Sequence, residues 1–156
     1  MKLYGKVPNG NMVLFYAGEF GYFMSNFSAF MVEYNGLLWP TSEHAYQAAK
    51  FDVGSKIYTE IYTARSAHIA LKLAIKNSDH VRTDWDSCVK VKAMEAIVTA
   101  KHDQHEYIQR KLQETGDAWL IENSQTDSFW GRGPDWKGRN ELGKIWMKIR
   151  KEHYGT

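Results

Sequence analysis

The amino-acid sequence predicts a mainly α-helical protein with small β-hairpin elements, folded as one compact multihelical domain over residues 1–156. A length of 156 residues is typical of a single domain. Residues 55–115 contain neither Gly nor Pro, and their apolar residues recur at helical spacing. All 12 Gly and 3 Pro residues, with most of the aromatic residues, lie in the two ends of the chain. We therefore expect turns and short strands in the ends and helices in the middle.

Residues 31–51 are predicted to form a hairpin followed by a capped helix. A hairpin is expected over residues 31–39, because the central Asn35-Gly36 pair tolerates the positive φ angles of a tight turn. Thr41 or Ser42 then caps a helix that continues to Phe51 without a Gly or Pro. The other expected elements, in chain order, are a strand at 12–16, helices at 55–64, 66–77, 84–101 and 104–114, a strand at 119–121, a loop at 131–138 and a helix at 141–152.

Charge and cysteine content narrow the class of protein. The net charge of +2 is mildly basic and does not by itself indicate a nucleic-acid partner. A single cysteine, Cys88, excludes an internal disulfide, and its place near the apolar stripe of the 84–101 helix predicts a small apolar filler. We see neither a signal-peptide core nor a run of about 20 apolar residues, so we expect a cytoplasmic protein without a membrane partner.

The sequence gives no pattern for a metal site or a cofactor. His102 and His105 are three residues apart, but no third ligand accompanies them. The glycines match neither a P-loop nor a dinucleotide fingerprint, and no GxSxG nucleophile elbow is present. We therefore expect no metal and no cofactor.

One helix face combines a carboxylate with an amine. Glu43 lies in the first turn of the predicted 42–51 helix, where the helix dipole favours an ionised carboxylate. Tyr46 or Gln47 and then Lys50 follow at i+3 or i+4 and i+7, on the same face over two turns. This face suits the polar wall of a cleft, but simple charge pairing at a helix start or a solvated stripe has the same pattern.

A second candidate segment lies near the C-terminus. A polar run starting at Asn123 ends at Asp127, and Phe129-Trp130 and Gly131 follow it. Asp127 suits a sugar hydroxyl and Trp130 suits a ring, although an ordinary loop with a hydrophobic anchor has the same composition. The basic residues between the following glycines, and a predicted helix N-terminus at Asn140, favour an anion.

The order and spacing of six segments are more informative than any one of them. The segments are Phe15-Tyr16, Phe23-Met24-Ser25-Asn26-Phe27, Trp39 to Phe51, Arg82-Thr83-Asp84-Trp85, Asp127 to Gly131, and Gly138 to Gly143. Together they resemble the NADAR family, whose bacterial members include the YbiA-like N-glycosidases. The resemblance runs from about Phe15 to Arg150 and implies a compact, mainly helical fold.

The resemblance also implies roles for individual residues. Glu43 matches the catalytic glutamate of the family, and Lys50 matches a lysine for which a Schiff base with the opened sugar has been suggested. Asp127 is the third expected catalytic residue, holding ribose hydroxyls. The expected substrate-binding residues are Ser25, Asn26, Phe27, Trp85, Trp130, Gly131 and Asn140.

These implied roles predict a hydrolase that cleaves an N-glycosidic bond between ribose and a nucleobase-like group. Members of the family act on phosphorylated ribosylamino-pyrimidine intermediates of riboflavin synthesis, which makes a small ribosyl compound the expected partner. One alternative is removal of ADP-ribose from guanine in nucleotides or DNA, with ADP-ribosylated DNA as a partner. Another is a non-catalytic module that binds NAD or ADP-ribose and does not need Glu43 beside Lys50.

Overall fold

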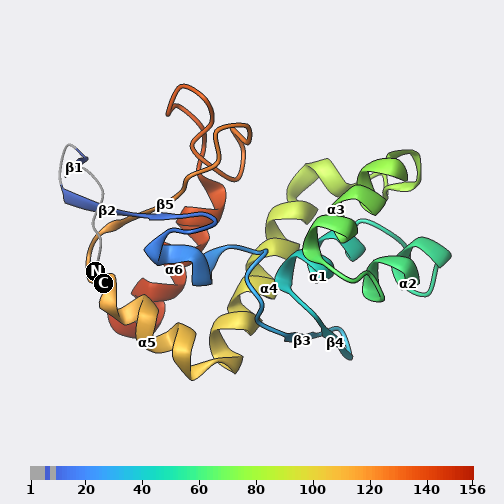
Figure 1. Cartoon of the computed structure of the whole chain (residues 1–156), viewed down its shortest axis with the longest axis horizontal. Helices are drawn as coiled ribbons and strands as arrows, with labels where there is room; N and C mark the ends of the chain where they lie inside the picture. Colours follow the sequence, from blue (N-terminus) through green and yellow to red (C-terminus); the bar gives the residue numbers. More distant parts are fainter. Residues whose placement is uncertain (1–5, 8–9) are drawn as a thin grey trace. The chain divides into compact units, whose positions relative to one another are not determined.

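The computed structural model describes residues 6–7 and 10–156 and divides them between two compact units (Figure 1). The terminal unit combines both ends of the chain, Met1–Ser25 and His105–Thr156. The central unit is the continuous stretch Asn26–Gln104. The described part of the chain is mainly helical with short strands, which confirms the predicted fold class.

The central unit begins with a β-hairpin and continues as helices. Strands β3 (Val32–Tyr34) and β4 (Leu37–Trp39) pair antiparallel around Asn35 and Gly36, whose φ angles of 50° and 78° fit the predicted tight turn. The helices are α1 (Ser42–Ala48), α2 (Lys56–Tyr62), α3 (Ala67–Lys76) and α4 (Lys90–Gln104), with 3₁₀ turn η2 (Ser78–His80) and π-helical turn η3 (Trp85–Val89) before α4.

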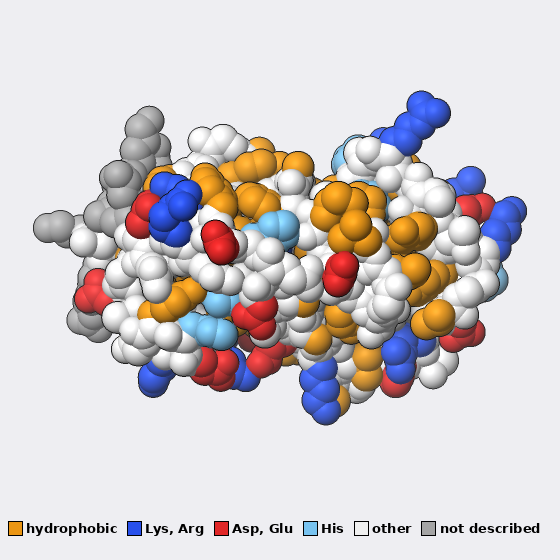
Figure 2. All heavy atoms as spheres, turned by 90° about the horizontal axis from the view of Figure 1, so that it is seen from below, with side chains coloured by type: hydrophobic (Ala, Val, Ile, Leu, Met, Phe, Trp, Pro, Cys, Tyr) orange, Lys and Arg blue, Asp and Glu red, His pale blue; other side chains and the backbone are white. Residues whose placement is uncertain are grey.

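Helix α1 lies at the centre of this unit. It packs against α2, α3 and α4, and all seven of its residues are buried. The core around it includes Trp39, Ile61 and Ile97, each at most 1% exposed. On the face seen in Figure 2, hydrophobic side chains gather over the part of the view that holds β3, β4 and α2.

The central unit also buries one lysine completely. Lys101 on α4 is 0% exposed, and its Nζ donates to the hydroxyl of Ser28 at 2.9 Å. The same nitrogen lies 5.4 Å from the ring centroid of Phe30. Burial lowers the pKa of Lys101 to about 7, because an ammonium loses its hydration in the interior.

The terminal unit is built on strands from both ends of the chain. Strand β2 (Gly10–Phe15) pairs antiparallel with β1 (Lys6–Val7) and parallel with β5 (Trp119–Glu122). Turn η1 (Phe20–Met24) and helices α5 (Glu106–Glu114) and α6 (Glu141–Tyr154) complete the unit. Helix α6 packs on β5, and the buried indole of Trp146 donates to the Met24 carbonyl oxygen at 3.1 Å.

The structure corrects two predicted helix boundaries. The helix expected over 42–51 ends at Ala48, where Lys50 N donates to Gln47 O and the chain tightens into a turn. The helix expected over 84–101 is interrupted at Ser87, whose ψ of −133° is non-helical, and α4 begins at Lys90. The Ser87 hydroxyl donates to Asp84 O at 2.6 Å, a local bond that competes with regular helix formation.

The π-helical turn also overturns the prediction for the cysteine. Cys88 is exposed, because η3 does not continue the buried face of α4. It is therefore not an apolar filler of the core. Among the described residues, none of the helices has the length and apolar character needed to cross a membrane.

Candidate functional site

Glu43 occupies the first turn of α1, and neighbouring residues hold that turn in place. Thr41 is the N-cap, and its hydroxyl accepts from His44 N at 3.2 Å. Glu43 N donates to Asn26 O at 3.1 Å, and the Ser42 hydroxyl donates to Asn26 Oδ1 at 3.1 Å. Glu43 is only 8% exposed, and it lies at the positive end of a short helix.

The histidine of this segment has a structural role. His44 Nε2 lies 2.9 Å from Ala64 O, and a carbonyl only accepts, so Nε2 carries the proton. Nδ1, 2.8 Å from the Thr41 hydroxyl, then accepts from it. Burial lowers the pKa of His44, which favours the neutral ring that this hydrogen-bond pattern requires. His44 therefore fastens the start of α1 to the segment before α3.

The Glu43 carboxylate has a direct partner one turn along α1. Gln47 Nε2 donates to Glu43 Oε1 at 2.7 Å, and Gln47 is 3% exposed. A hydrogen bond donated to a carboxylate favours its ionised form. Sequence reasoning placed Gln47 on this face but assigned it no role, although the i, i+4 spacing from Glu43 is the signal that predicts the contact.

Lys50 lies in the turn after α1, beyond the helical face on which it was predicted. Its Nζ is 5.4 Å from the ring centroid of Tyr46. Burial lowers the pKa of Lys50, while the charges of Glu43 and Asp86 act in the opposite direction and Lys90 adds to the lowering.

Trp85 lies beside Tyr46, as Lys50 does. Its ring centroid is 5.3 Å from that of Tyr46, and its side chain is 6% exposed. The segment before it is fixed to the turn that follows α1, since Arg82 N donates to Lys50 O at 2.9 Å. Within the central unit, Tyr46 thus lies beside both Lys50 and Trp85, and Glu43 is three residues before Tyr46 on α1.

A pocket of about 310 Å³ opens on the opposite side of α1. Ala45 and Ala49 contribute to its lining, whereas Glu43 and Lys50 do not. Five of the lining residues are aromatic: Tyr34, Trp39, Phe51, Tyr58 and Trp85. Trp85 therefore both lines this pocket and lies beside Tyr46 of α1.

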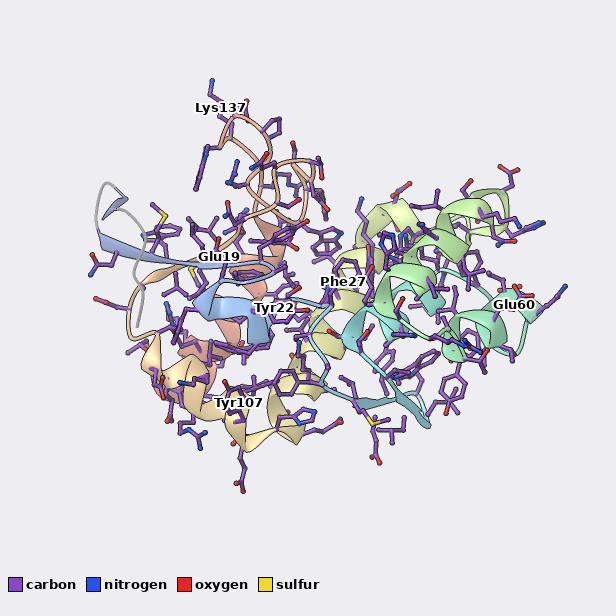
Figure 3. The ribbon with its side chains drawn as sticks, in the orientation of Figure 1. Glu19, Tyr22, Phe27, Glu60, Tyr107 and Lys137 are labelled. Carbon is purple, nitrogen blue, oxygen red and sulfur yellow. The ribbon has the colours of Figure 1, made fainter. Side chains whose placement is uncertain are left out.

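The three residues expected at 25–27 have different surroundings. Ser25 is buried at the end of η1, and its backbone N–H donates to Tyr22 O at 2.9 Å. Asn26 is 8% exposed, and its Nδ2 donates to Met94 Sδ at 3.3 Å while its Oδ1 accepts from Ser42. Phe27 is 37% exposed and projects from the segment before β3 (Figure 3). Asn26 thus links the start of α1 to α4.

Asp127 shapes its own loop in the terminal unit. Its Oδ1 accepts from Phe129 N at 2.9 Å and from Trp130 N at 2.8 Å, which closes a tight turn. The rings of Phe129 and Trp130 meet edge to face with centroids 4.8 Å apart. Gly131 is buried, and a Cβ there would lie 3.0 Å from Glu122 O, so the close approach to β5 favours glycine.

Asn140 fixes the far end of this loop to β5. Its Nδ2 donates to Leu120 O at 2.9 Å, and its Oδ1 accepts from Glu122 N at 3.0 Å. The residue has a φ of 51°, in the left-handed region that asparagine tolerates. Asn140 precedes α6 without capping it by its side chain. Its observed contacts are with the protein backbone, so its expected contact with substrate stays a prediction.

Two basic residues of the loop between Gly131 and Asn140 contact other side chains, namely Arg132 and Arg139. Arg132 is buried, donates from Nε to Asn123 Oδ1 at 2.6 Å and stacks 4.1 Å from the Trp136 ring. Arg139 pairs with Glu141 at 3.1 Å. Lys137 projects from the tip of the loop (Figure 3).

When each unit is considered by itself, its described residues do not bring three metal-ligating side chains within reach of one ion.

Comparison with known proteins places these residues in a family. The model of the NADAR domain matches residues 14–153, which is most of the chain. The chain belongs to the NADAR family. Glu43 and the other expected site residues all lie within the matched range.

Several curated relatives of this NADAR chain are named as enzymes. N-glycosidase YbiA of Escherichia coli (strain K12) is 35% identical over 94% of this chain and 91% of that protein. N-glycosidase Npun_R5314 of Nostoc punctiforme is 43% identical over 82% of this chain and 83% of that protein. Riboflavin biosynthesis protein VVA0006 of Vibrio vulnificus is 39% identical over 83% of this chain but only 35% of that protein.

The same likeness holds in three dimensions. The NMR structure of E. coli YbiA matches with a TM-score of 0.79 and 34% identity, covering 90% of this chain and 83% of that one. The predicted multihelical family fold is confirmed by this match.

Proposed function

We propose that this chain is an N-glycosidase that hydrolyses the bond between C1′ of a ribose and the nitrogen of a nucleobase-like group. The observation that carries the proposal is the buried Glu43 carboxylate at the start of α1, held by Gln47 at 2.7 Å, in a chain whose relatives are named N-glycosidases. The proposed substrate class is a phosphorylated ribosylamino-pyrimidine, since other relatives are named riboflavin biosynthesis proteins.

The chemistry of this bond explains the role proposed for Glu43. An N-glycosidic bond breaks through a transition state with positive charge spread over C1′ and the ring oxygen. A fixed carboxylate stabilises that charge more strongly in the transition state than in the ground state, and most strongly where water is excluded. Glu43 is 8% exposed and receives a hydrogen bond that keeps its carboxylate oriented. It also accepts a proton from the attacking water.

Lys50 is the proposed acid. As the C1′–N bond breaks, the Lys50 ammonium gives a proton to the departing nitrogen, and water oxygen bonds to C1′, leaving the free sugar and the free amine. Burial lowers the pKa of Lys50, which makes its ammonium a better proton donor than an exposed lysine. In an alternative route, the sugar ring opens to an imine between C1′ and the substrate nitrogen, and neutral Lys50 attacks C1′. The C1′–N bond to the substrate then breaks, the free amine leaves with a proton from the Lys50 nitrogen, and water hydrolyses the resulting Lys50 Schiff base to the free sugar and neutral Lys50.

The other expected residues are proposed to bind substrate. Trp85 closes the polar face of α1 from one side and excludes water, as its contact with Tyr46 suggests. In the terminal unit, Asp127 is proposed to hold ribose hydroxyls with the carboxylate oxygen that the turn does not use. Trp130, Gly131 and Asn140, with Ser25, Asn26 and Phe27, complete the proposed binding residues.

A substrate panel tests the proposal. Purified chain is incubated with a ribosylamino-pyrimidine phosphate, ADP-ribosylated guanosine, ADP-ribosylated DNA, NAD and ADP-ribose, and the products are separated by chromatography. We expect release of the free amine from the first compound. If guanine is released from the ADP-ribosylated compounds and no amine is released from the first compound, ADP-ribosylated guanine would replace the proposed substrate. If one or more compounds bind but none is cleaved, the proposal that the chain is an enzyme would be refuted.

A single substitution then tests the role of Glu43. Glu43→Gln keeps the size of the side chain but removes the charge, and we expect kcat/KM to fall by about 10²- to 10⁴-fold. Glu60→Gln, a change of the same kind on α2, is the matched control and should retain full activity. Turnover by Glu43→Gln near that of the unmodified chain would show that Glu43 is not the catalytic carboxylate.

A further inference from the structure

Within the described part of the chain, the side-chain oxygen of Gln47 has no hydrogen-bond partner. Gln47 is 3% exposed, and its Oε1 is inaccessible and unpaired within residues 6–7 and 10–156. Buried amide oxygens nearly always accept a hydrogen bond, because desolvation without a replacement donor is costly. An unpaired acceptor beside a candidate catalytic carboxylate therefore indicates a position that a bound molecule completes, after the side chains that cover Oε1 move aside.

The orientation of the Gln47 amide follows from its neighbour. Its nitrogen faces Glu43 Oε1 at 2.7 Å. An ionised carboxylate only accepts hydrogen bonds, so the opposite amide orientation would set two acceptors against each other. The Gln47 oxygen must consequently point away from Glu43, and the group that completes it must be a donor. A phosphate oxygen does not meet this condition, whereas a sugar hydroxyl does.

We propose that Gln47 is a specificity-determining residue whose Oε1 accepts a hydrogen bond from the ribose 2′-hydroxyl. This inference rests on the proposed function, in which Glu43 lies beside C1′. The 2′-hydroxyl is bonded to the carbon next to C1′. Gln47 Oε1 belongs to the same amide as the nitrogen that donates to Glu43, so it lies next to the carboxylate proposed to face C1′. In this proposal the Gln47 nitrogen orients the Glu43 carboxylate, and the Gln47 oxygen accepts from the 2′-hydroxyl.

The proposed contact makes the chain selective for ribosyl over 2′-deoxyribosyl compounds. Hydrogen bonds to the 2-hydroxyl of a sugar strengthen as charge develops at the adjacent carbon. A site built to bind a hydroxyl also discriminates against the analogue that lacks it, because its own acceptor is then left unpaired. The selectivity is expected to appear in kcat/KM.

The experiment compares a ribosylamino-pyrimidine phosphate with its 2′-deoxy analogue, each rate being divided by the uncatalysed rate of the same compound. We expect the unmodified chain to favour the ribosyl compound by about tenfold or more in this ratio. Gln47→Met removes both polar atoms at similar length and should lower activity on the ribosyl compound more than on the analogue, so that most of the selectivity disappears. Gln113→Met, an exposed glutamine on α5, is the control and should leave both rates unchanged.

Other results would overturn the inference. An equal loss on both compounds in Gln47→Met would show that Gln47 acts only by holding Glu43 or by positioning water. Absence of selectivity in the unmodified chain would exclude the contact even if Gln47→Met does not fold, and a melting curve identifies that case. Failure of the unmodified chain to cleave either compound would instead refute the proposed function, and the inference with it.

Discussion

The buried lysine of α4 should make the stability of this protein depend on pH in a way that one substitution removes. Lys101 is fully buried, and its pKa falls from the ordinary 10.5 to about 7. Between these two values the unfolded chain carries a proton on Lys101 that the folded chain lacks. The free energy of unfolding therefore rises with pH across this window, and below pH 7 the full cost of charging the buried amine is present.

The expected size follows from the two pKa values. From pH 7 to pH 9 the Lys101 contribution to the free energy of unfolding should increase by about 2 kcal/mol, because each pH unit inside the window is worth about 1.4 kcal/mol and the folded group is still half protonated at pH 7. Lys101→Met keeps the length of the side chain and removes the titrating amine. The variant should lack this increase.

Urea unfolding at pH 7 and pH 9 measures the effect. Groups other than Lys101 titrate in both proteins, so the quantity of interest is the change in free energy of unfolding of the original chain minus that of Lys101→Met. Lys72→Met on α3 is the matched control, since Lys72 is exposed and should leave the pH dependence unaltered. If Lys101→Met and the original chain gain stability in parallel between pH 7 and pH 9, the reasoning from burial is refuted.

Two further predictions concern the candidate site. Asn140→Ala should lower the free energy of unfolding by about 2–4 kcal/mol, since Leu120 O and Glu122 N lose their partners. Asn140→Gly should be less harmful than Asn140→Ala by about 1 kcal/mol, because glycine accepts the φ of 51° without strain; equal urea midpoints for the two variants would contradict this. If Lys50 is the acid, kcat/KM of the original chain should fall as pH rises through its lowered pKa, since the protonated form is required. Lys50→Arg should be slow and lack that alkaline fall, and a pH–rate profile that keeps it would assign the acid elsewhere.

Local signals in the sequence predicted much of the fold. Asn35-Gly36 fixed the hairpin, and Ser66 and Thr41 begin their helices as N-caps, because these features depend on a few neighbouring residues. The interruption at Ser87 was missed, since it depends on a competition between local hydrogen bonds and the helix that composition does not reveal. The parallel pairing of β2 with β5 joins strands more than a hundred residues apart and left no local signal.

The residues of the candidate site were likewise only partly predictable from the sequence. Glu43 stood out because a carboxylate in the first turn of a helix has a physical reason to be there, and the family resemblance then gave it a role. The proposed role of Gln47 depends on a side-chain oxygen that has no donor among the described residues, which only the three-dimensional structure reveals. The contacts of Asn140 with β5 are likewise tertiary, so sequence alone did not show that its amide is engaged by the backbone.

The division of the chain has a consequence for its synthesis. The central unit is one uninterrupted stretch, Asn26–Gln104, and all its strands and helices are available once that stretch has left the ribosome. The terminal unit cannot assemble until β5 and α6 exist, because β2 has to wait for a strand made more than a hundred residues later. Domains generally fold as units during synthesis. The central unit should therefore be the first to fold. Residues 12–15 of β2, with Val13 and Phe15 that are buried in the finished protein, meanwhile remain on the nascent chain without their partner strand β5.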